Sequence, residues 1–176
     1  MMSKSPANKQ SGFTIVELLI VIVVIGILAA ITVVAYNGVQ NRAYDVTVQS
    51  DLANMAKKFQ LFRVDNGTYP TVSTDLPSVD ARATKSAYLV GPATTYNVVP
   101  CVTSGGADFV VAAMSKSGNR YYSGSKSSGV VQFTGPSDWT TSNGYLAMCS
   151  DTLTGSSLPS GGGAPGYGGS WRPWLN

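Results

Sequence analysis

The chain of 176 residues carries 12 Lys and Arg against nine Asp and Glu, a formal net charge of +3, two Cys and no His. Its length suits one long helix with one compact domain rather than two full domains. Without a histidine, a Gly-x-Ser-x-Gly elbow or a phosphate-binding loop, the usual nucleophilic and metal-based sites cannot be assembled, so we expect neither an enzyme nor a cofactor.

The first segment in chain order is short, polar and basic, and an apolar run of membrane length follows it. Residues 1–12 include two Lys and no acid, and they end on Ser11-Gly12. Glu17 is then the only charged residue before Arg42. A lone charge in such a run is costly and indicates a functional site with a cationic partner, which no Lys or Arg within the run can supply.

The sequence Gly12-Phe13-Thr14-Ile15-Val16-Glu17-Leu18-Leu19 behind this leader resembles the N-terminus of a type IV prepilin. In the type IV pilin and pseudopilin family, a membrane peptidase cuts after the glycine, on the cytoplasmic side, and methylates the new N-terminal residue. The resemblance implies a prepilin leader at 1–12, cleavage after Gly12 and N-methylation of Phe13. It also implies the missing cation. The Phe13 ammonium of one subunit would pair with the Glu17 carboxylate of a neighbouring subunit, and each charge would compensate the other.

Two simpler explanations of the same segment account for less of it. A secretory signal peptide would be cleaved after its apolar core, near Ala29-Ala30, but this core is longer than the usual length of roughly 7–15 residues. A plain single-pass anchor fits the apolar length, since about 20 residues span a bilayer, and Lys4 and Lys9 would hold the N-terminus inside. It explains neither the lone acid nor the Gly-Phe junction.

One long helix is expected over 13–66, in two halves. Its first half, 13–36, is apolar on all sides and suits lipid or a filament core. Gly26 stands where many pilins have a helix-loosening glycine, whereas Val34 stands where many have a proline, so partial melting of this half stays an open question.

The second half, 37–66, is amphipathic. Apolar residues recur there at spacings of four, three, four and three, which predicts a stripe that packs on a folded domain: Val48, Leu52, Met55, Phe59 and Phe62. The other positions are polar, and the basic residues among them, Lys57, Lys58 and Arg63, favour a solvated face over a nucleic-acid footprint.

The helix is predicted to stop at Asn66-Gly67-Thr68-Tyr69-Pro70, because Asn-Gly tolerates positive φ and proline cannot continue the helical hydrogen bonds. This phrase is also similar to the motif that closes the long helix of many pilins and pseudopilins. The resemblance therefore covers about 60 residues, from the leader junction to Pro70.

A small β-rich head is predicted over 67–155. Residues 72–90 are expected to form a connecting loop with a short helix around 80–88. Candidate strands follow at 96–102, 108–114, 120–123 and 130–134, with a hairpin turn at Ser117-Gly118-Asn119. An antiparallel meander that lies on the apolar stripe of the helix makes the predicted fold α+β and pilin-like.

Two further features lie in the head and beyond it. Cys101 and Cys149 are expected to form a disulfide in an oxidising location, worth about 4 kcal/mol by loop-closure entropy. The tail, 156–176, is rich in Gly, Ser and Pro and is expected to be flexible. Its aromatic residues are equally compatible with binding a partner and with folding back onto the head: Tyr167, Trp171 and Trp174.

Together these features predict a structural subunit of an extracellular filament that serves surface attachment or motility. The resemblance implies its partners: further copies and other pilins, the prepilin peptidase and methyltransferase, and an inner-membrane assembly platform with its ATPase. The chain would span the cytoplasmic membrane with its N-terminus inside, and then enter a surface pilus. Two alternatives stay open. One is a pseudopilin of a type II secretion or DNA-uptake system, and only DNA uptake would involve nucleic acid. The other is a non-polymerising, membrane-anchored binding protein.

Overall fold

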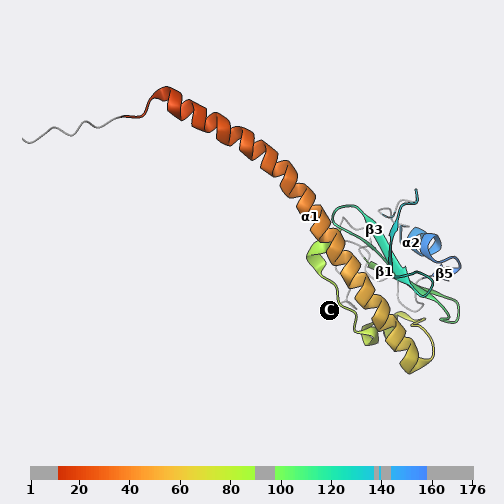
Figure 1. Ribbon diagram of the computed structural model, residues 1–176. Coiled ribbons are helices and arrows are strands. Elements are labelled where there is room, and N and C mark those ends of the chain that lie inside the picture. Colours follow the sequence, from red (N-terminus) through yellow and green to blue (C-terminus); the bar gives the residue numbers. More distant parts are fainter. Residues whose placement is uncertain (1–11, 90–97, 137–138, 140–143, 158–176) are drawn as a thin grey trace, which may run out of the picture. The chain divides into compact units, whose positions relative to one another are not determined.

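Figure 1 shows the computed structural model of the chain, which describes residues 12–89, 98–136, 139 and 144–157. The predicted leader up to residue 11, the first two residues of the first predicted strand and the aromatic residues of the tail lie outside these ranges. The elements are, in chain order, helix α1 (Ile15–Asn66), the 3-10 helices η1 (Ser73–Val79) and η2 (Lys85–Ala87), strands β1 (Val98–Thr103), β2 (Phe109–Met114), β3 (Arg120–Gly124) and β4 (Val130–Phe133), helix α2 (Gly144–Thr152) and strand β5 (Ser156–Ser157).

The chain divides into two compact units, Met1–Val39 and Gln40–Asn176, and α1 contributes residues to both. In the first unit, α1 is the described element. The second unit contains the rest of α1 together with the sheet, α2 and both 3-10 helices.

The end of α1 follows from its C-terminal residues. Gly67 has a φ of 82°, and its backbone N–H donates a hydrogen bond to the carbonyl of Arg63 at 2.8 Å. This left-handed cap is a conformation that glycine adopts without a steric penalty. Because Pro70 follows three residues after Gly67 and cannot donate a helical hydrogen bond, the helix does not resume, and its predicted stop at Asn66 is confirmed.

The sheet has the strand order β4-β3-β2-β1-β5, and all neighbouring strands are antiparallel. Strands β1 to β4 form the predicted meander, with bounds that agree to within two residues. The turn at Ser117-Gly118-Asn119 joins β2 to β3, and Gly118 has a φ of 93°, which favours glycine. The predicted α+β fold, with a long apolar helix and a small antiparallel sheet, is confirmed.

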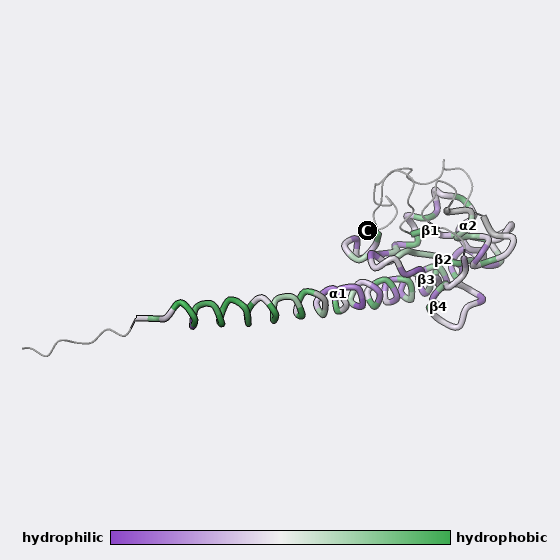
Figure 2. The backbone as a smooth tube through the Cα atoms, turned by 90° about the horizontal axis from the view of Figure 1, so that it is seen from above, coloured by the Kyte–Doolittle hydropathy of each residue, from purple (hydrophilic) through white to green (hydrophobic). Residues whose placement is uncertain are grey.

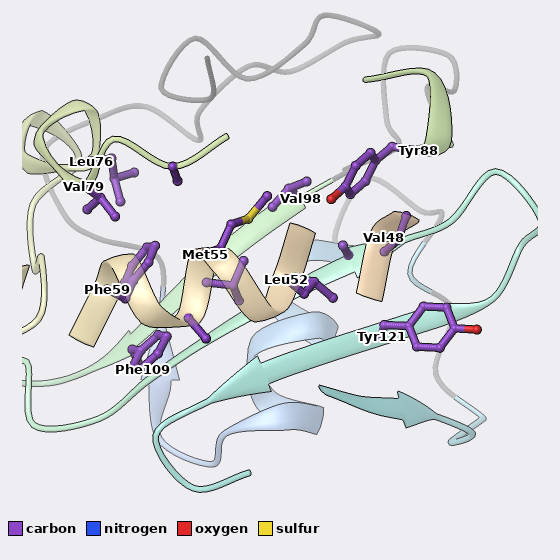
Figure 3. Packing of buried hydrophobic residues seen from close by; sticks show 14 of the residues in the cluster. Val48, Leu52, Met55, Phe59, Leu76, Val79, Tyr88, Val98, Phe109 and Tyr121 are labelled. Carbon is purple, nitrogen blue, oxygen red and sulfur yellow. The ribbon is translucent and has the colours of Figure 1, made fainter. Parts of the chain in front are cut away.

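Each face of the sheet covers a separate hydrophobic cluster. On one face, the predicted stripe of α1 packs on alternate residues of β1 to β3, and Phe59 of α1 stacks on Phe109 of β2 with ring centroids 5.1 Å apart (Figure 3). On the other face, Met148 and Cys149 of α2 pack with the buried Trp139. The side chains of β1, β2 and β3 therefore alternate between two cores.

The sequence does not predict α2 or β5. Helix α2 lies within the segment expected to be β-rich, and tertiary packing against the sheet stabilises this short helix. Strand β5 occupies the first two residues of the predicted flexible tail and pairs with Val102 and Thr103. The short helix expected around 80–88 is reduced to the three residues of η2, because Asp80 is left-handed, with a φ of 49°, and terminates η1.

Candidate assembly site

The apolar half of α1 exposes its side chains on all sides. Within the described part of the chain, α1 is the one helix long and apolar enough to cross a membrane, and its most apolar window of 18 residues has a mean hydropathy of 3.3. None of that window is buried by the rest of the chain, and Figure 2 shows it as a continuous hydrophobic stretch. Such a surface needs an apolar environment from outside the chain, either lipid or other helices.

Glu17 caps the start of this helix. The Glu17 Oε2 atom accepts hydrogen bonds from the backbone N–H of Thr14 at 2.9 Å and from its hydroxyl at 2.7 Å. In return, the backbone N–H of Glu17 donates to Thr14 Oγ1 at 3.2 Å. This reciprocal arrangement is a capping box with Thr14 at the N-cap, which is why α1 begins at Ile15 rather than at the predicted residue 13.

The capping box uses one carboxylate oxygen and leaves the other available. Among the described residues, Glu17 Oε1 accepts no hydrogen bond and no cation lies near it. An ionised carboxylate has about four acceptor positions on its two oxygens. The carboxylate is therefore oriented by its own chain and can still accept from a cation outside the described residues.

The two residues of the predicted cleavage junction, Gly12 and Phe13, lie before the helix and are exposed. The Phe13 side chain is 86% exposed, and a Cβ built on Gly12 would meet no atom within 4 Å. The structure thus brings Glu17 to Thr14, while the pairing of Glu17 with the Phe13 ammonium of a neighbouring subunit stays a prediction. The sequence reasoning missed Thr14, although a Thr-x-x-Glu sequence before an apolar run is the signature of a capping box.

In the second unit, two acids of α1 hold loops of the head in place. Asp45 accepts from the hydroxyl of Ser117 and, at 2.7 Å, from the amide of Asn119, both in the β2–β3 turn. This contact fixes the predicted hairpin turn on the helix.

The second acid, Asp51, accepts from the backbone N–H of Thr84 at 2.7 Å and from the hydroxyl of Tyr88 at 3.1 Å. Burial, followed by the charge of Asp51, raises the pKa of Tyr88 above its ordinary value. Tyr88 therefore stays protonated and keeps donating this hydrogen bond at alkaline pH as well.

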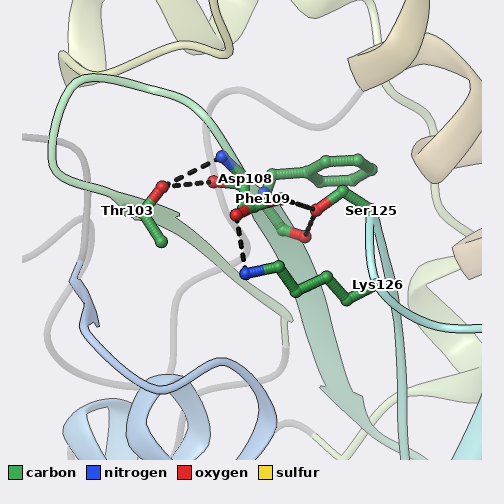
Figure 4. A network of polar contacts seen from close by, with 5 residues as sticks. All are labelled: Thr103, Asp108, Phe109, Ser125 and Lys126. Atoms are coloured by element: carbon green, nitrogen blue, oxygen red, sulfur yellow. Dashed lines mark hydrogen bonds and ion pairs between the residues drawn. The ribbon is translucent and has the colours of Figure 1, made fainter.

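A polar network ties the two turns at one end of the sheet (Figure 4). Asp108 pairs with Lys126 at 2.8 Å and accepts from the hydroxyl of Ser125 at 3.0 Å. The backbone N–H of Asp108 donates to Thr103 Oγ1 at 2.9 Å, and that of Phe109 donates to Ser125 Oγ at 3.2 Å. The network links the β1–β2 turn to the segment after β3.

Cys101 of β1 and Cys149 of α2 form a disulfide, with their Cα atoms 5.5 Å apart. Both residues are buried in the second hydrophobic cluster. The bond fixes α2 on the face of the sheet opposite to α1. Among the described residues, no group of three or more His, Cys, Asp or Glu side chains is placed to hold a metal ion.

The comparisons with known proteins agree with the N-terminal motif. The family model described as the prokaryotic N-terminal methylation motif matches residues 7–33, which include the Gly-Phe junction and the capping box. No solved structure matches the chain.

Several curated relatives that match the chain bear the name of one protein of the type II secretion system. The chain is 35% identical over 72 residues to the type II secretion system core protein G of Escherichia coli, over 41% of this chain and 50% of that protein. The proteins of the same name from Aeromonas hydrophila and Vibrio cholerae are 33% identical over 72 residues and 30% identical over 77 residues. These alignments cover 41% and 44% of this chain, and 50% and 53% of the two relatives. The chain thus spans about half the length of the relatives it matches.

Proposed function

We propose, because the chain carries the N-terminal methylation motif of the pilin and pseudopilin family, that it is a structural subunit that acts by polymerising. A prepilin peptidase would cut after Gly12 and methylate Phe13. The apolar half of α1 would first anchor the subunit in the cytoplasmic membrane with its N-terminus inside. It would then move into the core of a filament, so that its exposed apolar side chains keep apolar neighbours throughout.

The single observation that carries this proposal is the oriented carboxylate of Glu17 in an otherwise uncharged apolar run. The capping box holds Glu17 Oε2 and leaves Oε1 free for a cation. Cleavage would create an ammonium at Phe13, and the ammonium of one subunit would pair with Glu17 of the next. Since either charge alone in a helical bundle is heavily penalised, assembly is favoured only where the two meet.

Replacing Glu17 by Gln tests this pairing. A glutamine at the third helical position still forms a capping box, so Glu17→Gln keeps the cap and removes the charge, whereas Glu17→Ala removes both. We expect both variants to insert in the membrane and to be cleaved after Gly12, and neither to enter filaments. Wild-type filament yield from Glu17→Gln would restrict Glu17 to a capping role and refute the pairing.

Among filaments of this kind, we place the subunit in a type II secretion machine, as a pseudopilin, rather than in a pilus for attachment or motility. The support is the similarity to core protein G of that system in several bacteria. Its partners would be other pseudopilins and an assembly platform driven by an ATPase. Deleting the gene should then abolish the appearance of exported proteins in the medium. A deletion strain that secretes normally but loses surface attachment or twitching would assign the subunit to a pilus instead.

A further inference from the structure

The exposed side of the second half of α1 carries an apolar crest, formed by Leu61 and Val64, which are 58% and 80% exposed. These residues lie opposite the stripe that packs on the sheet. Around the helix axis, their side chains point about half a turn away from those of residues 55 and 59. The head therefore buries one side of the helix and leaves the apolar crest exposed on the other side.

A pocket lies on each side of this crest. The first has a volume of about 400 Å³ and lies between α1 and η1, and Asp65 and Asp75 are among its lining residues. The Lys58–Asp80 ion pair, at 3.1 Å, also lines it. Within the described part of the chain, Asp65 and Asp75 have no cationic partner, so this flank carries two uncompensated negative charges.

The second pocket, of about 240 Å³, lies between α1 and the β3–β4 turn. Small residues form most of its walls, and among the described lining residues Lys57 alone is charged. Lys57 is exposed and makes no ion pair with any described residue. The two flanks of the same helix therefore bear opposite unpaired charges, each without an ion-pair partner among the described residues.

We propose that these flanks bind each other in neighbouring copies of the chain. The Lys57 flank of one subunit would dock on the Asp65 and Asp75 pocket of the next subunit, with Leu61 and Val64 packed between them. The occupant is a second copy because the unpaired charges of one flank complement those of the other. The inference rests on the proposed filament and adds a lateral contact between heads.

The symmetry of this contact agrees with polymerisation. Each subunit would use two different surfaces, one towards each neighbour, which makes the interface heterologous. Heterologous contacts repeat without limit when the rotation does not close a ring, and so they generate helical filaments. Two like flanks would instead repel, because the unpaired charges on each flank have the same sign.

Charge exchange in the full-length chain tests the proposal. We expect Lys57→Glu, and separately the pair Asp65→Lys and Asp75→Lys, to lower the yield of sheared filaments by about tenfold or more, since each places like charges together. Combining all three substitutions should restore most of the yield. Lys85→Glu makes the same charge change at an exposed residue outside both pockets and should leave the yield unchanged. In every variant, cleavage after Gly12 should stay normal.

Cross-linking identifies the occupant. With Lys57→Cys and Asp75→Cys chains produced in the same cells, oxidation should give a covalent dimer of this chain, and neither variant alone should give one. Three results would each overturn the inference but not the filament. They are wild-type filament yield from Lys57→Glu, no recovery of yield in the triple variant, and a cross-link to a different protein. Absence of filaments from the wild type would instead refute the proposed function.

Discussion

Thr14 positions the carboxylate of Glu17, and a substitution at Thr14 tests this positioning without changing the charge of Glu17. Thr14→Ala removes the hydroxyl that both donates to Glu17 and accepts from its N–H. Loss of an N-cap costs about 1 kcal/mol, so the amide protons of the first helical turn should exchange about fivefold faster in the detergent-solubilised chain. Thr14→Ser keeps the hydroxyl and is the control. Equal exchange rates in the Ala and Ser variants would show that the capping box does not hold in solution.

Asp108 makes the head sensitive to acid. The hydrogen bond from Lys126, followed by that from Ser125, lowers the pKa of Asp108 below its ordinary value of 3.8. Because the folded-state pKa lies below the unfolded one, the stabilisation is present above the ordinary value and is lost as the pH falls through the folded-state pKa.

We therefore expect the free energy of unfolding to decrease less steeply below about pH 4 in Asp108→Asn than in the wild type. Denaturant titrations at a series of acidic pH values measure this slope. The difference should be small, because the Lys126 side chain is 66% exposed. Parallel pH curves for the two proteins would exclude a contribution of this ion pair to stability.

At the scale of elements, the contact between α1 and the sheet depends on Phe59. This side chain is fully buried and stacks on Phe109, whereas Phe62, one turn later, is half-buried at the margin of the same cluster. Phe59→Ala should lower the free energy of unfolding by about 3–5 kcal/mol through lost burial and a cavity. Phe62→Ala, the matched control, should cost about 1 kcal/mol. Similar losses from both variants in urea titrations would contradict the packing.

The sequence predicts elements well where the pattern is strong and local. The spacing of the stripe residues and the Asn66-Gly67 stop specify α1, and β-branched runs between turn residues specify β1 to β4. Helix α2 is not predicted from the sequence, because it is short and is stabilised by residues distant in the chain, including Cys101 of β1. Strand β5 is not predicted from the sequence, because two serines in a Gly-rich and Ser-rich segment carry no strand signal.

At the scale of the whole molecule, the candidate site is simpler to predict than the head. Glu17 is evident from the sequence because a single charge in an apolar run has no competing explanation of equal strength. Its bond to Thr14 is equally local, and the rule for a capping box finds it. The charged flanks beside Leu61 and Val64 are different, because they arise only when η1 and the β3–β4 turn fold against α1.

The central claim is that the chain is cleaved after Gly12 and polymerises through its new N-terminus. The most direct measurement is mass spectrometry of the N-terminal peptide from filaments sheared off the cells, with a variant carrying a bulky residue at position 12 as the uncleaved control. We predict a peptide that begins at Phe13 with a methyl group on its amine, and no such peptide from the variant. Intact Met1 in the membrane pellet, with nothing released by shearing, would contradict the account and leave Glu17 without its proposed partner.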